Sequence, residues 1–509
     1  MQGQQADLQA GTAPRPKATG WRFADFAPAG KRAGTAERPV VCVQGLGFVG
    51  AAMAAAVARA RDGDGEACFN VLGVELETAR GRAAVDRLNA GRFPQATSDE
   101  ALAEAVAAAA EAGNLVATTD PAAYGLASVI LVDVNLDLDP GLPHGELPAL
   151  ELDGFRAAIE TVGARMAPGT LVIVETTVPP GTCAKVVAPI LSAALAARGL
   201  GAEDFLLAHS YERVMPGADY LDSIVNYWRV YAGHTPAAAE ACAAFLGKVV
   251  NVADYPPARL ASTTASETAK VLENSYRAVN IAFMEEWGRF AEAVGVDLFE
   301  VVEAVRQRPS HSNLRQPGFG VGGYCLPKDP LLAAAAAREI FGLEGLDFPF
   351  CRLAVETNRA MPLVTLAAVE RLLGGSLDGA RILLLGVSYR PEVADTRFAP
   401  AEAFVEAAER KGASVLPHDP LVRHWPERDQ AIPEALPDPG GADAVVFAVP
   451  HADYLALDLA AWFGAARPAV VDANRVLTPA QRNAAARLGC RFHSVGRGDH
   501  ETGETPCAH

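Results

Sequence analysis

One cysteine, one lysine and one aspartate lie within five residues of each other, directly behind a glycine-rich loop. The loop is Gly318-Phe319-Gly320-Val321-Gly322-Gly323, and Tyr324-Cys325-Leu326-Pro327-Lys328-Asp329 follows it. Glycine lets a backbone approach a ligand closely and adopt a positive φ. A thiol beside a lysine is favoured as the thiolate, which is its nucleophilic form. The segment predicts covalent catalysis by Cys325, and the alternative is a surface turn that carries a core cysteine.

A second glycine-rich segment, Gly45-Leu46-Gly47-Phe48-Val49-Gly50, lies between a predicted strand at 40–44 and an alanine-rich helix at 51–61. In that context it is the fingerprint of a dinucleotide-binding turn. The next predicted strand, 69–74, ends at Glu75, where a carboxylate can bond a ribose 2′-hydroxyl and would repel a 2′-phosphate, so NAD is favoured over NADP. We expect the cofactor-binding residues here to be Gly45, Gly47, Phe48, Val49, Gly50 and Glu75.

The elements around these segments predict the fold class. Strand patterns at 128–134, 171–175 and 205–209 alternate with helical patterns such as 98–112 and 152–166. Long helical patterns at 237–247 and 265–294 then replace them, and strands return at 381–386, 413–417, 444–449 and 469–472. Strands that alternate with helices indicate a parallel, doubly wound sheet. The sequence therefore predicts an α/β protein with two Rossmann-like doubly wound domains joined by a long central helix.

Other polar clusters follow predicted strands, where open α/β sheets bind ligands. Glu175-Thr176-Thr177-Val178-Pro179-Pro180-Gly181-Thr182 and Tyr211-Glu212-Arg213 are two of them. Tyr389-Arg390 and Asp395-Thr396-Arg397 flank a strand end in the last domain. On the long helix, Lys270 and Asn274 are four residues apart and share a face. Each residue alone reads as a surface or turn residue.

Composition excludes several classes of protein. The 509 residues carry a formal net charge of −17, which argues against nucleic acid as a partner. The eight cysteines form no CxxC pair, so we expect no metal site and a reducing cytoplasm. The first 36 residues hold no apolar run typical of a signal peptide, and no other apolar run has the length of a membrane span.

The ordered combination of these motifs resembles the nucleotide-sugar 6-dehydrogenase family, which contains UDP-glucose, GDP-mannose and UDP-N-acetylhexosamine dehydrogenases. The resemblance covers nearly all of residues 40–477. Its carriers are the Gly45 fingerprint, Asn114 to Asp120, the run Thr176 to Thr182, Glu212-Arg213, Lys270 with Asn274, Gly322-Gly323-Tyr324-Cys325 with Lys328-Asp329, and Asp395-x-Arg397-x-x-Pro400.

The resemblance implies an NAD-dependent four-electron oxidation of a sugar C6 alcohol to a carboxylate, through a thiohemiacetal and a thioester on Cys325. It implies that Lys270 and Asn274 steady the oxyanion and that the residues which hold or activate water are Asp329, Thr177 and Glu212. Thr177 and Lys328 would also contact the cofactor. Expected substrate-binding residues are Glu212, Arg213, Lys270, Asn274, Arg308, Gly320, Gly322, Gly323, Tyr389, Arg390 and Arg397.

The element pattern, the composition of the two ends and the resemblance together predict a domain order. We expect a disordered tail at 1–36, an NAD-binding domain at 37–238 and a central helical region with the catalytic loop at 239–368. A nucleotide-sugar-binding domain at 369–495 and a flexible tail at 496–509 would follow. The amphipathic pattern at 267–294 predicts that the central helix pairs two copies of the chain as a homodimer or a higher homo-oligomer.

Three positions depart from the family's usual residues. This chain has Asn135-Leu136 where the family has a Thr-Pro pair, Tyr211 where it has a proline and Arg390 where it has a lysine. Substrate motifs are mixed, because 212–217 resembles the N-acetylhexosamine branch and 323–329 resembles bacterial UDP-glucose dehydrogenases. A UDP-sugar is favoured. Two alternatives remain at this stage: a two-electron hydroxyacid dehydrogenase, which would not need Cys325, and a non-catalytic NAD-sensing Rossmann protein, which would need neither Cys325 nor Lys270.

Overall fold

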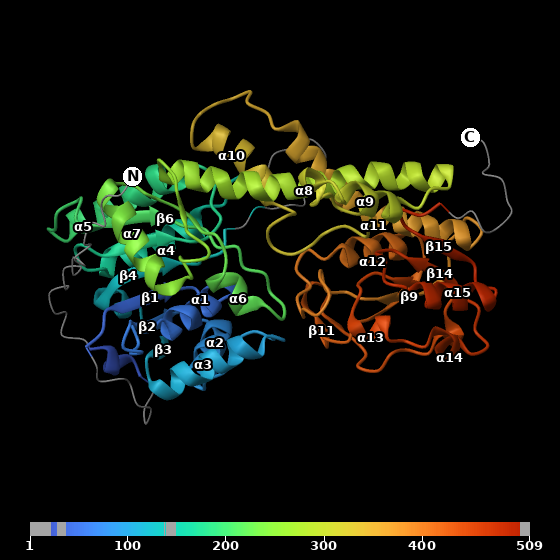
Figure 1. Cartoon of the computed structure of the whole chain (residues 1–509), viewed down its shortest axis with the longest axis horizontal. Coiled ribbons are helices and arrows are strands. Elements are labelled where there is room, and N and C mark those ends of the chain that lie inside the picture. Colours follow the sequence, from blue (N-terminus) through green and yellow to red (C-terminus); the bar gives the residue numbers. More distant parts are fainter. Residues whose placement is uncertain (1–21, 28–36, 137, 139–148, 499–509) are drawn as a thin grey trace, which may run out of the picture. The chain divides into compact units, whose positions relative to one another are not determined.

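The computed structural model describes residues 22–27, 37–136, 138 and 149–498 (Figure 1). The chain divides into two compact units, and each is described separately. Unit 1 contains residues 1–137 and 151–268, and unit 2 contains residues 138–150 and 269–509. The three-domain division expected from the sequence stays a prediction.

Unit 1 is built on an eight-stranded sheet with the order β3-β2-β1-β4-β5-β6-β7-β8. Its strands and helices are β1 (Val40–Gln44), α1 (Phe48–Arg59), β2 (Asn70–Val74), α2 (Ala79–Asn89), α3 (Glu100–Ala112), β3 (Leu115–Thr118), β4 (Ala127–Val132), α4 (Asp153–Arg165), β5 (Leu171–Val174), α5 (Ala188–Ala197), β6 (Leu206–His209), α6 (Tyr220–Val225), β7 (Val230–Gly233), α7 (Pro236–Val249) and β8 (Ala258–Arg259).

The central strands of unit 1 are buried on both faces, which is why they read as apolar runs without alternation, whereas the edge strand β8 is exposed. One face packs against α1, α3, α6 and α7 in a single hydrophobic core. The buried, alanine-rich surface of α1 lets that helix approach β1 and β2 closely. The predicted doubly wound sheet is confirmed. It has one antiparallel pair, β6 with β7, and the sequence pattern did not indicate β7.

Unit 2 contains most of the long helix α8 (Thr263–Val294), which starts in unit 1, and a five-stranded parallel sheet with the order β10-β9-β13-β14-β15. Its other strands and helices are α9 (Leu298–Arg306), α10 (Leu332–Glu339), α11 (Pro349–Leu372), β9 (Arg381–Leu385), α12 (Pro400–Arg410), β10 (Ser414–His418), β11 (His424–Trp425), β12 (Gln430–Ala431), β13 (Ala444–Phe447), α13 (Ala452–Leu455), α14 (Leu459–Phe463), β14 (Ala469–Asp472), α15 (Pro479–Arg487) and β15 (Phe492–Ser494).

Two hydrophobic clusters cover the two faces of this smaller sheet, one including α11 and α12 and the other including α14 and α15. Local signals place several helix starts. Asp297 accepts the N–H of Phe299 at the start of α9, and Thr478 forms a capping box with Gln481 at the start of α15. The second Rossmann-like sheet predicted from the sequence is therefore confirmed.

The expected disorder of the two tails stays a prediction. Residues 1–21 and 28–36 lie outside the described residues, but the short 3-10 helix Phe23–Phe26 buries both of its phenylalanines. At the other end, Gly496 donates its N–H to Glu292 Oε1 at 2.7 Å, and Arg497 pairs with Asp297 at 3.1 Å. Residues 499–509 lie outside the described residues. Within the described ranges, no helix has the length and apolarity to cross a membrane.

Candidate active site

Glycines shape the loop between β1 and α1. Gly45 has φ +90°, and a Cβ atom there would lie 2.6 Å from the backbone oxygen of Asp133. A Cβ atom at Gly50 would lie 1.9 Å from the oxygen of Gly45, so only glycine fits either position. Around Gly47, which caps α1, a Cβ atom would meet nothing within 4 Å. This open approach to the N-terminus of α1 fits the pyrophosphate of a dinucleotide.

Glu75 lies directly beside this loop. Its Oε2 atom accepts the N–H of Leu46 at 2.6 Å, and its Oε1 atom accepts the N–H of Leu76 at 3.0 Å. The carboxylate is thus fixed at the end of β2, where a dinucleotide's ribose lies in Rossmann folds. Tyr220 donates its hydroxyl to the oxygen of Phe48 at 2.6 Å and supports the start of α1 from α6. The residues present therefore fit NAD.

The predicted residues Thr177, Glu212 and Arg213 follow β5 and β6 in unit 1. Thr177 and Glu212 are buried, with 9% and 8% of their surface exposed, and Glu212 accepts the N–H of Val214. Arg213 donates to the Tyr211 hydroxyl at 3.3 Å and lies over the Tyr211 ring at 5.5 Å. Tyr211, which departs from the family pattern, therefore packs against a predicted substrate-binding residue.

Sequence reasoning missed a buried acidic cluster around Arg229. Arg229 pairs with Glu175 at 3.1 Å, and both side chains are almost completely buried. Burial and Glu212 raise the pKa of Glu175 to about 7 against the opposing charge of Arg229. Burial, Glu175 and Glu212 raise the pKa of Asp133 well above its ordinary value. One signal was present in the sequence, because Asp133 lies within the apolar strand pattern at 128–134. The observed strand β4 ends at Val132, one residue before this aspartate.

In unit 2, the loop at 318–323 is held tightly against its surroundings. Gly323 has φ +78°, and a Cβ atom there would lie 2.9 Å from the ring of Tyr389. A Cβ atom at Gly322 would lie 2.5 Å from the oxygen of Phe398. Asn358, on α11, accepts the N–H of Val321 at 2.8 Å and donates to its carbonyl oxygen at 2.7 Å. The predicted residues Gly320, Gly322 and Gly323 thus belong to one rigid loop.

A buried polar network lies directly behind Cys325. The N–H groups of Lys328 and Asp329 both donate to the carbonyl oxygen of Cys325, at 3.1 and 2.9 Å. Lys328 Nζ pairs with Asp329 Oδ1 at 2.9 Å, and Asn274 Nδ2 donates to Asp329 Oδ2 at 2.7 Å. Lys270 is buried one turn before Asn274 on α8. The structure thus brings the predicted residues Asn274, Lys328 and Asp329 together beside the backbone of Cys325, which is itself partly exposed.

Two cations lie close to the ring of Tyr324, the residue that precedes Cys325. Lys328 Nζ lies 4.3 Å from the centre of the Tyr324 ring, and the Arg397 guanidinium lies 5.5 Å from it. Asp395 holds Arg397 through two hydrogen bonds of 2.7 and 2.9 Å. Burial raises the pKa of Tyr389 to about 12, with Asp395 and Cys325 adding to the shift. Lys328 is already paired with Asp329. The expectation that Lys328 favours the thiolate of Cys325 therefore leaves out the opposing charge of Asp329.

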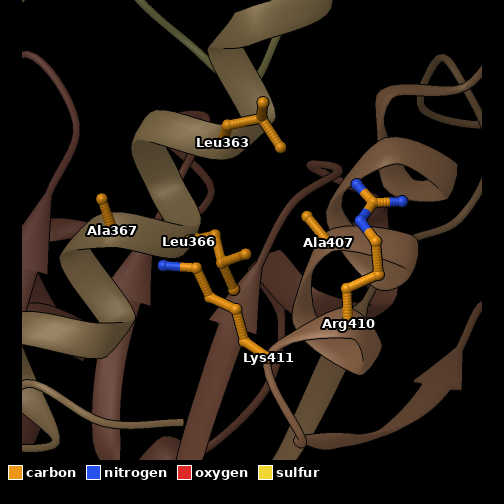
Figure 2. Close-up of a pocket in the computed structure, with 6 residues that line it drawn as sticks. All are labelled: Leu363, Leu366, Ala367, Ala407, Arg410 and Lys411. Carbon is orange, nitrogen blue, oxygen red and sulfur yellow. The ribbon is translucent and has the colours of Figure 1, made fainter.

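Two predicted substrate ligands are more peripheral. Arg308 caps the short 3-10 helix Pro309–His311, and it is exposed, as is Arg390. A pocket between α11 and α12 lies among Leu363, Leu366, Ala367, Ala407, Arg410 and Lys411 (Figure 2). Lys411 already pairs with Glu370 at 2.6 Å and Arg410 with Glu406 at 3.6 Å. The pocket contains none of the predicted site residues.

Glu267 is a second residue that sequence reasoning missed. It is completely buried in unit 1, and its carboxylate accepts the N–H groups of Gly181 at 2.6 Å and Cys183 at 2.7 Å. These bonds fasten the start of α8 to the segment that follows Thr177. A signal was present, because Glu267 lies three residues before Lys270 and seven before Asn274, on the same helical face.

Comparison with known proteins agrees with this geometry. Models of the UDP-glucose/GDP-mannose dehydrogenase family match residues 40–248 as the NAD binding domain, 264–360 as the central domain and 383–479 as the UDP binding domain. A UDP-N-acetyl-D-mannosamine dehydrogenase of Pyrococcus horikoshii is 32% identical over 357 residues, which are 69% of this chain and 78% of the relative.

Two further similarities extend over more of the chain. An NDP-N-acetyl-D-galactosaminuronic acid dehydrogenase of Ralstonia nicotianae is 30% identical over 82% of this chain and 92% of its own. The solved structure of a UDP-D-ManNAc dehydrogenase from Pyrococcus horikoshii aligns with a TM-score of 0.74 and 28% identity, covering 90% of this chain and all of that one. The chain belongs to the UDP-glucose/GDP-mannose dehydrogenase family of NAD-dependent nucleotide-sugar dehydrogenases.

Proposed function

We propose that this nucleotide-sugar dehydrogenase oxidises the C6 alcohol of a UDP-N-acetylhexosamine to the uronate in two successive hydride transfers, with Cys325 holding the intermediate. The observation that carries the proposal is the network of Asn274, Lys328 and Asp329, buried directly behind a partly exposed cysteine. Buried charged groups destabilise a protein unless each of them is paired. A cysteine with only a structural role does not require such a network beside it.

NAD, when bound, supplies the hydride acceptor for each oxidation. After the first oxidation, the Cys325 sulfur attacks the C6 aldehyde carbon, and the carbonyl electron pair becomes an alkoxide that is protonated to a thiohemiacetal. Lys270 and one N–H of Asn274 stabilise that oxygen. The second oxidation leaves a thioester, and water adds to its carbonyl carbon and displaces the thiolate. The free aldehyde is never released.

The remaining predicted residues position water and substrate. Thr177 and Glu212 hold the water, and Asp329 fixes Asn274. The glycine loop offers backbone N–H groups to the diphosphate. Arg397, held by Asp395, supplies charge to the substrate, with Arg213, Tyr389, Arg390 and Arg308 as further contacts.

The sugar class is proposed from two agreeing sources. The segment 212–217 has the form typical of the N-acetylhexosamine branch, and two relatives at 30% identity or more are named for N-acetylated hexosamines or their uronic acids. UDP is proposed as the nucleotide because residues 383–479 match a UDP binding domain.

A homodimer formed through α8 is part of the proposal. One stripe of α8 leaves large apolar side chains exposed, at spacings of three, four and seven residues, namely Leu272, Tyr276, Phe283, Trp287, Phe290 and Val294. Edge-to-face contacts of 6.2 and 5.8 Å link Phe283 to Trp287 and Trp287 to Phe290. An aromatic stripe of this size on a helix suits burial against a second copy.

Stoichiometry tests the proposed function. The purified protein is incubated with NAD and a panel of UDP- and GDP-sugars, and NADH and uronate are both quantified. We expect two NADH per UDP-N-acetylhexosamine. One NADH per sugar would indicate a two-electron dehydrogenase, and better turnover of UDP-glucose or GDP-mannose would overturn the substrate assignment.

A further inference from the structure

Four charged side chains are packed into the carboxyl end of the unit 1 sheet. Asp133 follows β4, Glu175 follows β5, Glu212 follows β6 and Arg229 precedes β7. Arg229 is 1% exposed and Glu175 is 1% exposed. Both carboxylate oxygens of Asp133, and Oε2 of Glu175, are buried without a hydrogen-bond partner. The cluster therefore contains acceptors that its own residues do not satisfy.

The charges of this cluster do not balance. With all groups ionised, three carboxylates and one guanidinium carry a net charge of −2. Two further neighbours of Arg229 are uncharged: Met53 of α1, whose sulfur lies 3.1 Å from the guanidinium, and Cys242 of α7, a buried thiol whose pKa is raised by burial. An ionised carboxylate that is buried without a hydrogen-bond partner is costly, and Glu175 adds like charge, so the pKa of Asp133 lies well above its ordinary value.

The cluster also has a defined place relative to the dinucleotide loop. The strand order reverses between β1 and β4, and ligands of doubly wound sheets bind at such a switch point. Asp133 lies at it, because its N–H donates to the oxygen of Gln44 at 2.9 Å. A Cβ atom at Gly50 would come within 3.1 Å of Asp133 Cβ. Asp133 thus touches the loop that fits the cofactor.

The nicotinamide ring is cationic in NAD⁺ and neutral in NADH, and doubly wound folds bind dinucleotides at this edge of the sheet. We propose that the Asp133–Glu175–Glu212–Arg229 cluster holds a proton in the free enzyme, releases it to solvent when NAD⁺ binds and regains it when the ring is reduced. Asp133 is the residue that exchanges the proton, because neither of its carboxylate oxygens has a hydrogen-bond partner. The inference rests on cofactor binding at the Gly45 loop.

A metal ion is the main alternative to a proton as the ligand of three neighbouring carboxyl groups. Within the described residues, no group of three or more His, Cys, Asp or Glu side chains has an arrangement that could hold one. Arg229 already occupies the position of a counter-ion through its bond to Glu175. A proton is therefore the charge that the cluster gains and loses.

Calorimetric titration of the full-length enzyme tests this coupling. NAD⁺ and NADH are each titrated at pH 7 in two buffers of different ionisation enthalpy, which gives the number of protons exchanged. We expect release of on the order of one proton per NAD⁺, little per NADH, and NAD⁺ affinity that rises up to about tenfold per pH unit. In Asp133→Asn, both the release and the pH dependence should be lost while NAD⁺ still binds.

Asp99→Asn is the matched control, because Asp99 is a buried aspartate of unit 1 whose oxygens accept the N–H groups of Leu102 and Leu221. It should release the wild-type number of protons. If Asp133→Asn does not fold, Glu175→Gln and the wild-type comparison of NAD⁺ with NADH still decide. Equal proton release for the two redox states, or wild-type release in Asp133→Asn, would overturn the inference. Failure of the wild type to bind NAD⁺ would instead overturn the assigned cofactor site.

Discussion

Asn274 Nδ2 donates to Asp329 Oδ2 at 2.7 Å, which joins α8 to the segment that carries Cys325. The two residues are 55 positions apart in the sequence and both are buried. Because the amide has a second N–H, this bond orients Asn274 without using up its capacity as a donor. The position of the segment that carries Cys325 therefore depends on α8.

Asn274→Asp should disable the enzyme by placing two carboxylates at hydrogen-bond distance. One must then take a proton, so we expect a loss of roughly 3 kcal/mol in stability, the scale of a broken buried pair. Turnover should fall and recover partly at lower pH. Asn280→Asp, one to two turns further along α8, should leave both properties unchanged, since Asn280 is only half-buried. Denaturation and pH–rate profiles measure the effect, and wild-type behaviour of Asn274→Asp would contradict the proposed network.

Cys325→Ser should keep binding of both ligands but lose turnover to the carboxylate by two or more orders of magnitude, because an ester hydrolyses more slowly than a thioester. Mass spectrometry after incubation with NAD and UDP-N-acetylhexosamine should then detect an adduct near the mass of the nucleotide sugar. Cys351→Ser is the control, as this partly buried cysteine lies on α11. Wild-type turnover of Cys325→Ser with two NADH per sugar would make Cys325 structural.

NAD should be preferred over NADP by at least about tenfold in kcat/KM, which corresponds to about 1.4 kcal/mol. The reason is the Glu75 carboxylate fixed beside Leu46, where a 2′-phosphate would meet like charge. Glu75→Gln should reduce the preference. Glu77→Gln should not, because the exposed Glu77 is engaged by Thr119 and Arg82. Equal use of both cofactors by the wild type would remove Glu75 from the site.

Trp287→Glu should separate the proposed dimer into monomers, since Trp287 lies at the middle of the aromatic stripe of α8. Sedimentation at micromolar concentration measures the change. Leu343→Glu introduces the same charge at a similarly exposed apolar residue outside that stripe and should leave the dimer intact. A wild-type enzyme that is monomeric and fully active would show that α8 has no such role.

Stability of the cofactor-free enzyme should fall as pH rises from about 4.5 to about 7. The pKa of Glu175 rises from 4.5 to about 7 in the folded protein, so the folded state binds more protons than the unfolded state across this window. Burial raises the pKa of Asp133 in the same direction, so Asp133→Asn should be more stable than the wild type at pH 8, by roughly 1–3 kcal/mol, and nearly equal to it at pH 4.5. Urea denaturation at the two pH values checks this, and a wild type that gains stability toward pH 7 relative to Asp133→Asn would contradict it.

The sequence by itself predicted the two sheets and most of their strands, because buried parallel strands appear as short apolar runs between helices. It also identified Cys325, Lys328 and Asp329, whose relationship is local and visible in consecutive residues. The Gly45 fingerprint was equally readable, since the steric demands at Gly45 and Gly50 arise within one turn.

Only the tertiary structure decided which distant side chains meet. Three hydrogen bonds join segments that lie far apart in the chain. They link Asn274 to Asp329, Asn358 to Val321 and Glu267 to Gly181. The acidic cluster around Arg229 is the clearest case, as three strand ends and the start of a fourth strand each contribute one charge. The periodicity of the sequence does not predict which of these charged side chains lie together. Their burial and pairing depend on the order of the strands in the sheet and not on the spacing of the strands in the sequence.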